Sequence, residues 1–149
     1  MSIAEIILLV EDDPDDAELT LRALGEARVQ PRVVHVRDGV QALDYLLCRG
    51  VHAARAETER PVLVLLDLKL PRVGGIEVLR EVRANEATKH LPVVILTSSS
   101  EDRDRLAAYD HHANSYIRKP VDYDQLVAAA RQLGLYWLVL NLPAPPPRS

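Results

Sequence analysis

Carboxylates, a hydroxyl and an amine stand at the ends of four apolar segments of the sequence. Glu11-Asp12-Asp13 follows one segment and Asp67 another, while Thr97 and Lys119 close two more. Two carboxylates roughly 4 Å apart repel by about 1 kcal/mol in water and about 4 kcal/mol at an effective dielectric of roughly 20. A hard divalent cation relieves this repulsion, and Mg²⁺ with retained waters suits such oxygen ligands.

Each carboxylate also has a purely structural interpretation. Asp12 or Asp13 before Pro14 is typical of a helix start, where the side chain caps free N–H groups. Asp67 would serve as a turn residue that ends a strand. Neither role explains why carboxylates, a hydroxyl and an ammonium should meet at one edge of a sheet. A nucleophilic carboxylate with a metal, a hydroxyl and an ammonium to hold phosphoryl oxygens is a site for phosphoryl transfer.

Five short apolar runs alternate with segments of helical periodicity. The runs span 6–10, 33–36, 62–66, 93–96 and 115–117, and helical spacing starts after Pro14, after Gly39 and after Gly75, and covers 100–109 and 121–133. Three runs are almost continuously apolar, which indicates strands covered on both faces. The alternation predicts an α/β fold, a doubly wound five-stranded parallel sheet with five helices, whose sites lie at the carboxyl ends of the strands.

Composition excludes several classes of protein. The 149 residues are 48% apolar and 27% charged, as in one globular domain, and the net charge is −4 without a basic cluster, so we expect no nucleic-acid partner. Cys48 is the one cysteine, so no intrachain disulfide forms and a reducing cytoplasmic location is expected. The N-terminus lacks the pattern of a signal peptide, and the apolar stretches 61–66 and 135–140 fall short of the roughly 20 residues of a membrane span, so no membrane partner is expected.

Four motifs, taken together and in order, resemble the receiver domains of two-component response regulators over about residues 6–133. The matching stretches are Ile7-Leu8-Leu9-Val10-Glu11-Asp12-Asp13, Leu65-Leu66-Asp67-Leu68-Lys69-Leu70-Pro71 with Gly74-Gly75, Val94-Ile95-Leu96-Thr97-Ser98, and Tyr116-Ile117-Arg118-Lys119-Pro120. Any one of these motifs alone would be a weak signal. The resemblance implies a flavodoxin-like fold and a role in phosphorelay signalling.

The same resemblance implies how the acidic residues divide their work. Asp67 would accept a phosphoryl group from a phosphohistidine on a sensor histidine kinase. Glu11 and Asp12 would hold Mg²⁺ together with Asp67, helped by the backbone carbonyl of Lys69. Glu11 stands where Asp is more usual in the family, which should still serve but shift the metal slightly.

Further roles follow from the resemblance for the residues near the last two strands. Thr97 and Lys119 would bind the phosphoryl oxygens, and Lys119–Pro120 would carry the cis peptide bond that the family places there. Tyr116 matches the aromatic switch position, which turns inward when Thr97 moves toward the phosphate. Tyr116 is equally understood as a half-buried aromatic residue with a hydrated hydroxyl, and both interpretations can hold together.

The chain divides into a receiver domain at 1–134, with an extended loop at 49–60, and a tail at 135–149. The tail begins with a hydrophobic arm of Leu135, Tyr136, Trp137, Leu138, Val139 and Leu140 and ends in a Pro-rich segment. We expect the arm to contact a second copy and form a homodimer, because an exposed patch this apolar marks an interface. The alternative is that the arm folds back and enlarges the core of its own domain.

The tail, the loop at 49–60 and the stretch 35–46 also resemble the single-domain regulators that are paired with bacterial phytochrome kinases. This narrower resemblance implies a phytochrome-type histidine kinase as partner and a homodimer, in some members through a C-terminal arm. Nothing after Leu142 is expected to fold, so the output would pass through a downstream protein partner. No enzymatic activity is expected beyond self-catalysed phosphotransfer and dephosphorylation.

Two other functions use the same residues. A small Mg²⁺-dependent phosphohydrolase could form an aspartyl phosphate at Asp67, but such enzymes usually carry a second acidic residue close after the nucleophile, where this chain has Leu68 and Lys69. A phosphate-independent binding module would tolerate loss of the Asp67 carboxylate. We favour the phosphorylated signalling domain over both.

Overall fold

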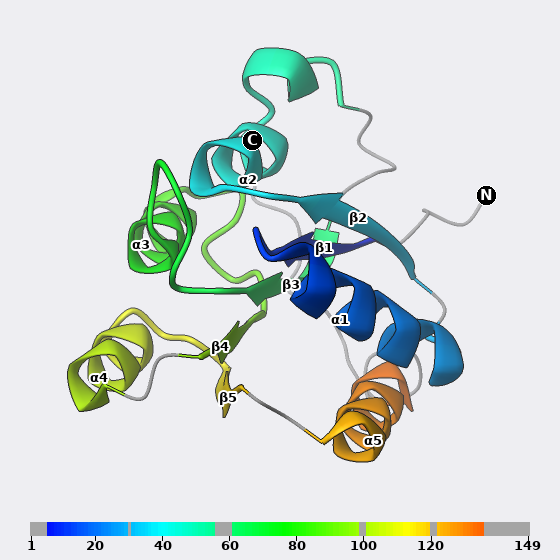
Figure 1. Ribbon diagram of the computed structural model, residues 1–149. Helices are drawn as coiled ribbons and strands as arrows, with labels where there is room; N and C mark the ends of the chain where they lie inside the picture. Colours follow the sequence, from blue (N-terminus) through cyan, green and yellow to red (C-terminus); the bar gives the residue numbers. More distant parts are fainter. Residues whose placement is uncertain (1–5, 30, 56–60, 99–100, 120–121, 136–149) are drawn as a thin grey trace.

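A five-stranded parallel sheet with the strand order β2-β1-β3-β4-β5 forms the centre of the molecule (Figure 1). The computed structural model describes residues 6–29, 31–55, 61–98, 101–119 and 122–135. The strands are β1 (Ile6–Val10), β2 (Arg32–Val36), β3 (Pro61–Leu66), β4 (Val93–Thr97) and β5 (Ser115–Arg118). The helices are α1 (Pro14–Glu26), α2 (Gly39–Leu46), α3 (Gly75–Ala84), α4 (Asp102–Asp110) and α5 (Tyr123–Leu135), with a 3₁₀ turn, η1 (Gly50–His52). The predicted doubly wound, flavodoxin-like fold is confirmed.

Helices cover both faces of the sheet (Figure 1), which explains the continuous apolar runs. Along β1, Leu8 and Val10 face a core shared with α2, α3 and α4, whereas Ile7 and Leu9 face a second core shared with α1 and α5. Every residue of β1 and of β4 is therefore buried. Side chains alternate between two apolar layers instead of between a core and solvent.

The backbone ladder continues past the strand ends and brings distant residues together. The N–H of Glu11 donates to the carbonyl of Val36 at 3.1 Å, and the N–H of Asp67 donates to the carbonyl of Val10 at 3.1 Å. Between the neighbouring strands β4 and β5, the N–H of Lys119 donates to the carbonyl of Thr97 at 2.7 Å. The residues that follow β1 and β3, and those that close β4 and β5, thus lie along one edge of the sheet.

In two regions the structure contains more regular structure than the sequence predicted. The loop predicted at 49–60 contains η1, and Arg55 anchors it by donating from Nε to the carbonyl of Tyr45 at 2.9 Å. Helix α5 continues to Leu135, two residues beyond the predicted end at 133. Residues 136–140 of the hydrophobic arm lie outside the described residues. None of the helices traced in the structure has the length and apolar character that a membrane crossing requires.

Candidate functional site

The start of α1 separates the roles of two neighbouring acids. The carboxylate of Asp13 accepts the backbone N–H groups of Asp15 at 2.8 Å and Asp16 at 3.1 Å, and Pro14 is the first helical residue. Asp13 is therefore the helix cap. Asp12 is left with an exposed carboxylate at the end of the sheet.

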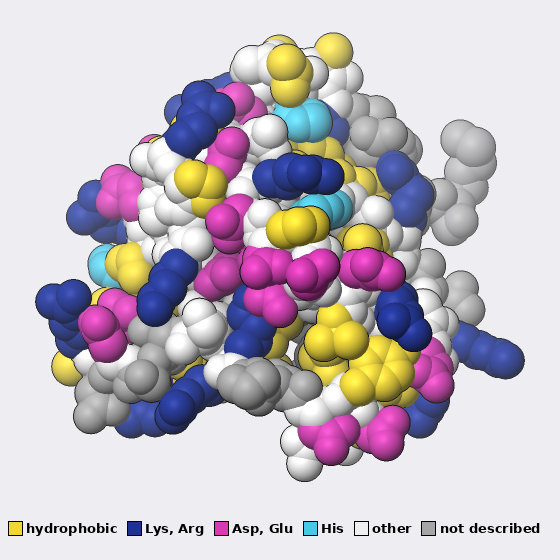
Figure 2. Space-filling view, viewed as in Figure 1, with side chains coloured by type: hydrophobic (Ala, Val, Ile, Leu, Met, Phe, Trp, Pro, Cys, Tyr) yellow, Lys and Arg dark blue, Asp and Glu magenta, His cyan; other side chains and the backbone are white. Residues whose placement is uncertain are grey.

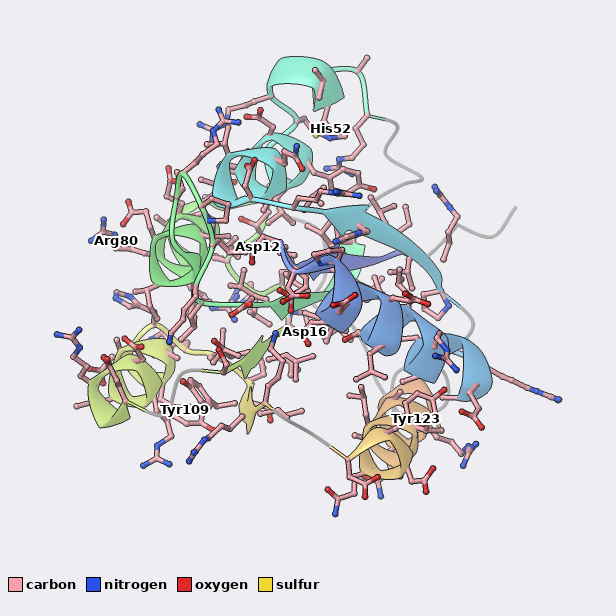
Figure 3. All side chains as sticks on the ribbon, in the orientation of Figure 1. Asp12, Asp16, His52, Arg80, Tyr109 and Tyr123 are labelled. Carbon is pink, nitrogen blue, oxygen red and sulfur yellow. The ribbon has the colours of Figure 1, made fainter. Side chains whose placement is uncertain are left out.

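Three carboxylates meet at the carboxyl edge of the sheet. Glu11, Asp12 and Asp67 each offer an oxygen atom, and these atoms all lie within 4.8 Å of one another. Glu11 is 2% exposed and Asp67 is 6% exposed, so two of the three negative charges are buried. Figure 2 shows acidic side chains gathered in a band across this face, and Figure 3 places Asp12 there beside the start of α1. An all-oxygen set of this kind would fit a hard divalent cation, and Asp12 is its exposed member.

Lys119 places its ammonium among these carboxylates. Its Nζ lies 2.5 Å from Oε1 of Glu11, 2.9 Å from Oδ2 of Asp16 and 3.4 Å from Oδ2 of Asp67. The lysine side chain is 12% exposed, so its charge depends on these partners. Lys119 and Asp67 were predicted from the sequence to meet, and the structure brings them together.

Asp16 also belongs to the site, although the sequence did not predict it (Figure 3). It lies in the first turn of α1, and its partner Lys119 is 103 residues further along the chain. The available signal was its spacing: Asp16 follows Pro14 by two residues, in the first turn of a helix that starts directly after Glu11-Asp12-Asp13. That spacing alone does not distinguish a site residue from an acidic residue that stabilises the helix N-terminus.

The buried charges shift each other's protonation. Burial raises the pKa of Glu11 to about 7, and the negative charge of Asp67 adds to this, while the hydrogen bond from Lys119 opposes it. Burial alone would lower the pKa of Lys119, but its hydrogen bonds to Glu11 and Asp16 and the negative charges of Asp67 and Glu11 together raise it. Lys119 therefore stays protonated near neutral pH, while Glu11 titrates there.

The turn after β3 fixes the Asp67 carboxylate. Its Oδ1 accepts the backbone N–H of Lys69 at 3.1 Å. Gly75, the first residue of α3, packs directly on this turn, and its N–H donates to the carbonyl of Leu68 at 3.0 Å. A side chain at Gly75 would overlap the carbonyl oxygen of Asp67 and lie 2.6 Å from Cα of Leu68. Glycine is thus required for the close approach of α3 to the strand end.

The remaining predicted residues occupy the same end of the sheet or the adjoining core. Thr97 ends β4 and is fully buried. Tyr116 pairs with Ile95 in the β4–β5 ladder and is half-buried against the core that includes α2 and α3. Lys69 is exposed in the turn after β3. The Lys119–Pro120 peptide bond falls outside the described residues.

A doubly wound sheet with acids, a threonine and a lysine at its carboxyl edge is the arrangement expected of a signalling receiver domain, and comparison with known proteins identifies this family. Residues 7–131 match the family described as the response regulator receiver domain. The chain belongs to this family. It is a receiver domain of two-component signalling, and the comparisons give no support to the phosphohydrolase alternative.

Two relatives show how far the similarity extends. The chain is 41% identical over 136 residues to the probable methanogenesis regulatory protein FilR2 of Methanothrix harundinacea (strain 6Ac), covering 91% of this chain and 85% of that one. It is 36% identical over 141 residues to the response regulator Rcp1 of Synechocystis sp. (strain ATCC 27184 / PCC 6803 / Kazusa), covering 94% of each.

Solved structures of response regulators are similar to this chain over nearly its whole length. The phosphorylated cyanobacterial phytochrome response regulator RcpA superposes with a TM-score of 0.82 at 38% identity, covering 94% of this chain and 98% of that chain. The Mn²⁺-bound form of Rcp1 has a TM-score of 0.81 at 34% identity and coverages of 94% and 99%. The bacteriophytochrome response regulator RtBRR has a TM-score of 0.77 at 51% identity and coverages of 94% and 84%.

Proposed function

We propose that Asp67 is the phosphoryl acceptor of this receiver domain. The observation that carries the proposal is the convergence of Asp67 with Glu11, Asp12 and Lys119 from three separate strand ends. The Asp67 carboxylate is buried yet keeps one oxygen toward the ammonium of Lys119 and the other on a backbone N–H. This arrangement orients a nucleophile and surrounds it with groups that stabilise added negative charge.

The donor is a phosphohistidine on a sensor histidine kinase. An oxygen of the ionised Asp67 carboxylate attacks the phosphorus atom, a P–O bond forms and the P–N bond to the imidazole breaks. The electron pair of the broken bond returns to the imidazole nitrogen, which takes up a proton from solvent. Lys119 holds its charge throughout and offsets the charge on the transferred oxygens.

Mg²⁺ is the cation we assign to the carboxylate cluster. Glu11, Asp12 and Asp67 supply oxygen ligands, and the backbone carbonyl of Lys69 would add another. When bound, Mg²⁺ neutralises the negative charge of the phosphoryl oxygens. The related regulator Rcp1 has a solved Mn²⁺-bound form, which supports a divalent cation as ligand.

Phosphorylation switches the outer surface through Thr97, Lys119 and Tyr116. To move a two-state protein from 1:99 to 99:1 requires about 5.5 kcal/mol of differential binding. Charge-assisted hydrogen bonds contribute about 1.5 to 3 kcal/mol each, so contacts from Thr97, Lys119 and a backbone amide together approach that value. Tyr116 follows Thr97 and turns inward, while Lys119–Pro120 keeps the cis bond that the family places there. The domain then has no catalytic output except its own phosphorylation and dephosphorylation.

The kinase that we assign is of the phytochrome type, and the protein acts in the cytoplasm as a homodimer. Similarity to the cyanobacterial phytochrome response regulator RcpA and the bacteriophytochrome response regulator RtBRR supports the kinase assignment. In this proposal residues 1–134 form the receiver domain, and the arm from Leu135 to Leu140, within the tail at 135–149, joins two copies. A downstream protein, and neither nucleic acid nor a membrane, receives the signal.

Phosphotransfer tests the kinase and the acceptor together. Autophosphorylated, radiolabelled phytochrome kinase and an unrelated histidine kinase are each mixed with the full chain and Mg²⁺. We expect rapid transfer from the phytochrome kinase, and no transfer to Asp67→Asn, which removes the nucleophile with little change of shape. Equal labelling of Asp67→Asn would refute the acceptor, whereas faster transfer from the unrelated kinase would refute only the partner.

A further inference from the structure

Lys119 has three carboxylate partners, and one of them lies outside the metal-binding cluster. Glu11 and Asp67 belong to the cluster, whereas Asp16 contributes from the first turn of α1. An ammonium group has three N–H donors, so the three carboxylates match its donors one for one. Asp16 is also the most accessible of the three, with a side chain 41% exposed compared with 2% for Glu11 and 7% for Asp67.

A metal ion and Lys119 compete for the same two carboxylates, those of Glu11 and Asp67. Oε1 of Glu11 accepts from Lys119 at 2.5 Å, and Oε2 accepts the N–H of Asp13 at 3.3 Å, so both oxygens are already engaged. A cation that binds Glu11 has to displace one of these hydrogen bonds, and its double positive charge also repels the ammonium. Lys119 is too buried to lose its partners without a large cost.

We propose that Asp16 is a positioning residue, which retains Lys119 beside the site when a divalent cation takes Glu11 and Asp67. This inference rests on the proposed function for the identity of the site. The Asp16 carboxylate is the acceptor that metal binding leaves to Lys119, at 2.9 Å from Nζ. Without it, Lys119 remains on Glu11 and Asp67 and competes with the cation. The effect of Asp16 on the metal therefore passes through Lys119.

The test is the affinity of the full chain for Mg²⁺, which requires no phosphorylation and is measured by calorimetric titration. Asp16→Asn is compared with Asp15→Asn, each in the natural background and in Lys119→Met. Asp15 is the matched control, because it lies in the same turn, carries the same charge and makes no ion pair with Lys119 within the described ranges. Circular dichroism and thermal melting confirm that each variant is folded.

We expect Asp16→Asn to weaken Mg²⁺ binding about tenfold, the effect of one charge-assisted hydrogen bond, and Asp15→Asn to weaken it by about twofold or less. In the Lys119→Met background the two substitutions should have equal effects. Equal effects in the natural background, or an excess effect of Asp16→Asn that persists in Lys119→Met, would overturn the proposal. A natural chain that binds no Mg²⁺ would instead contradict the proposed metal site itself.

Discussion

Glu11 is deeply buried and also belongs to the cluster of carboxylates that would bind a metal ion. Its protonation state therefore affects metal binding. An ordinary glutamate is ionised at neutral pH, but burial and the charge of Asp67 raise the pKa of Glu11 to about 7. A cation that binds here has to displace a proton as well as the hydrogen bond from Lys119. Metal affinity and pH are therefore linked at this single residue.

We expect the affinity for Mg²⁺ to increase as pH rises from about 6 to about 8, because Glu11 loses its competing proton near pH 7. The stability of the metal-free protein should change in the opposite sense. Glu11 contributes stability below its ordinary pKa of 4.5, and this contribution is lost as pH rises through about 7. Titration of Mg²⁺ across this range measures the first effect and denaturant unfolding the second. Glu11→Gln is the control, and a pH-independent affinity in the natural chain would contradict the assignment.

Lys119→Met separates metal binding from the switch. We expect Mg²⁺ to bind at least as tightly, because its competitor for the oxygens of Glu11 and Asp67 is gone, while the response to phosphorylation fails. Amide NMR spectra with beryllofluoride and Mg²⁺ report that response. Lys89→Met, at a partly exposed lysine paired with Glu86 away from the site, should respond like the natural chain. A full spectral response of Lys119→Met would show that the ammonium is not needed.

At the residue level, the sequence predicts those site residues that come together because each lies at the end of a strand. Asp12, Asp67 and Lys119 follow or close apolar runs, and the parallel sheet then requires them to meet. Asp16 could not be predicted in the same way, because its importance depends on a contact with a lysine 103 residues distant. The choice of Asp13 over Asp12 as the helix cap likewise depends on the local geometry of the turn.

Among the elements, the junction of β3 with α3 controls the site most directly. We expect Gly75→Ala to destabilise the protein by about 1 to 3 kcal/mol, because a methyl group there meets backbone atoms of Asp67 and Leu68 that cannot move aside. Denaturant unfolding measures this loss. Gly25→Ala is the control, since the space around Gly25 in α1 is open and alanine favours helix by up to about 1 kcal/mol. Equal stability of the two variants would contradict the close approach.

The sequence predicts the ends of the strands only where they coincide with the ends of the apolar runs. Arg32 and Pro61 begin β2 and β3 one residue before the predicted strands at 33–36 and 62–66, because both pair with Ile6 in the ladder. Arg83 of α3 donates to the carbonyls of Leu91 at 2.6 Å and His112 at 2.8 Å, which ties α3 to the connection before β4 and to the connection before β5. No local pattern identifies such an arginine, since its partners are set by the packing of separate elements.

For the whole molecule, the arm determines the expected oligomeric state. Helix α5 carries the chain to Leu135, where the apolar block begins. We expect the full chain to sediment as a dimer and a chain ending at Gly134 as a monomer. The shortened chain lacks the apolar arm through which the two copies are proposed to associate. Circular dichroism checks that the shortened chain is folded. Equal masses for the two chains would contradict dimerisation through the arm.

The proposed signalling function requires an acyl phosphate at Asp67. The most direct measurement is to incubate the natural chain with Mg²⁺ and acetyl phosphate and to locate the phosphoryl group by tandem mass spectrometry. We predict modification of Asp67, dependent on Mg²⁺ and absent in Asp67→Asn. A phosphoryl group on a different residue, or none while Mg²⁺ is bound, would contradict the account.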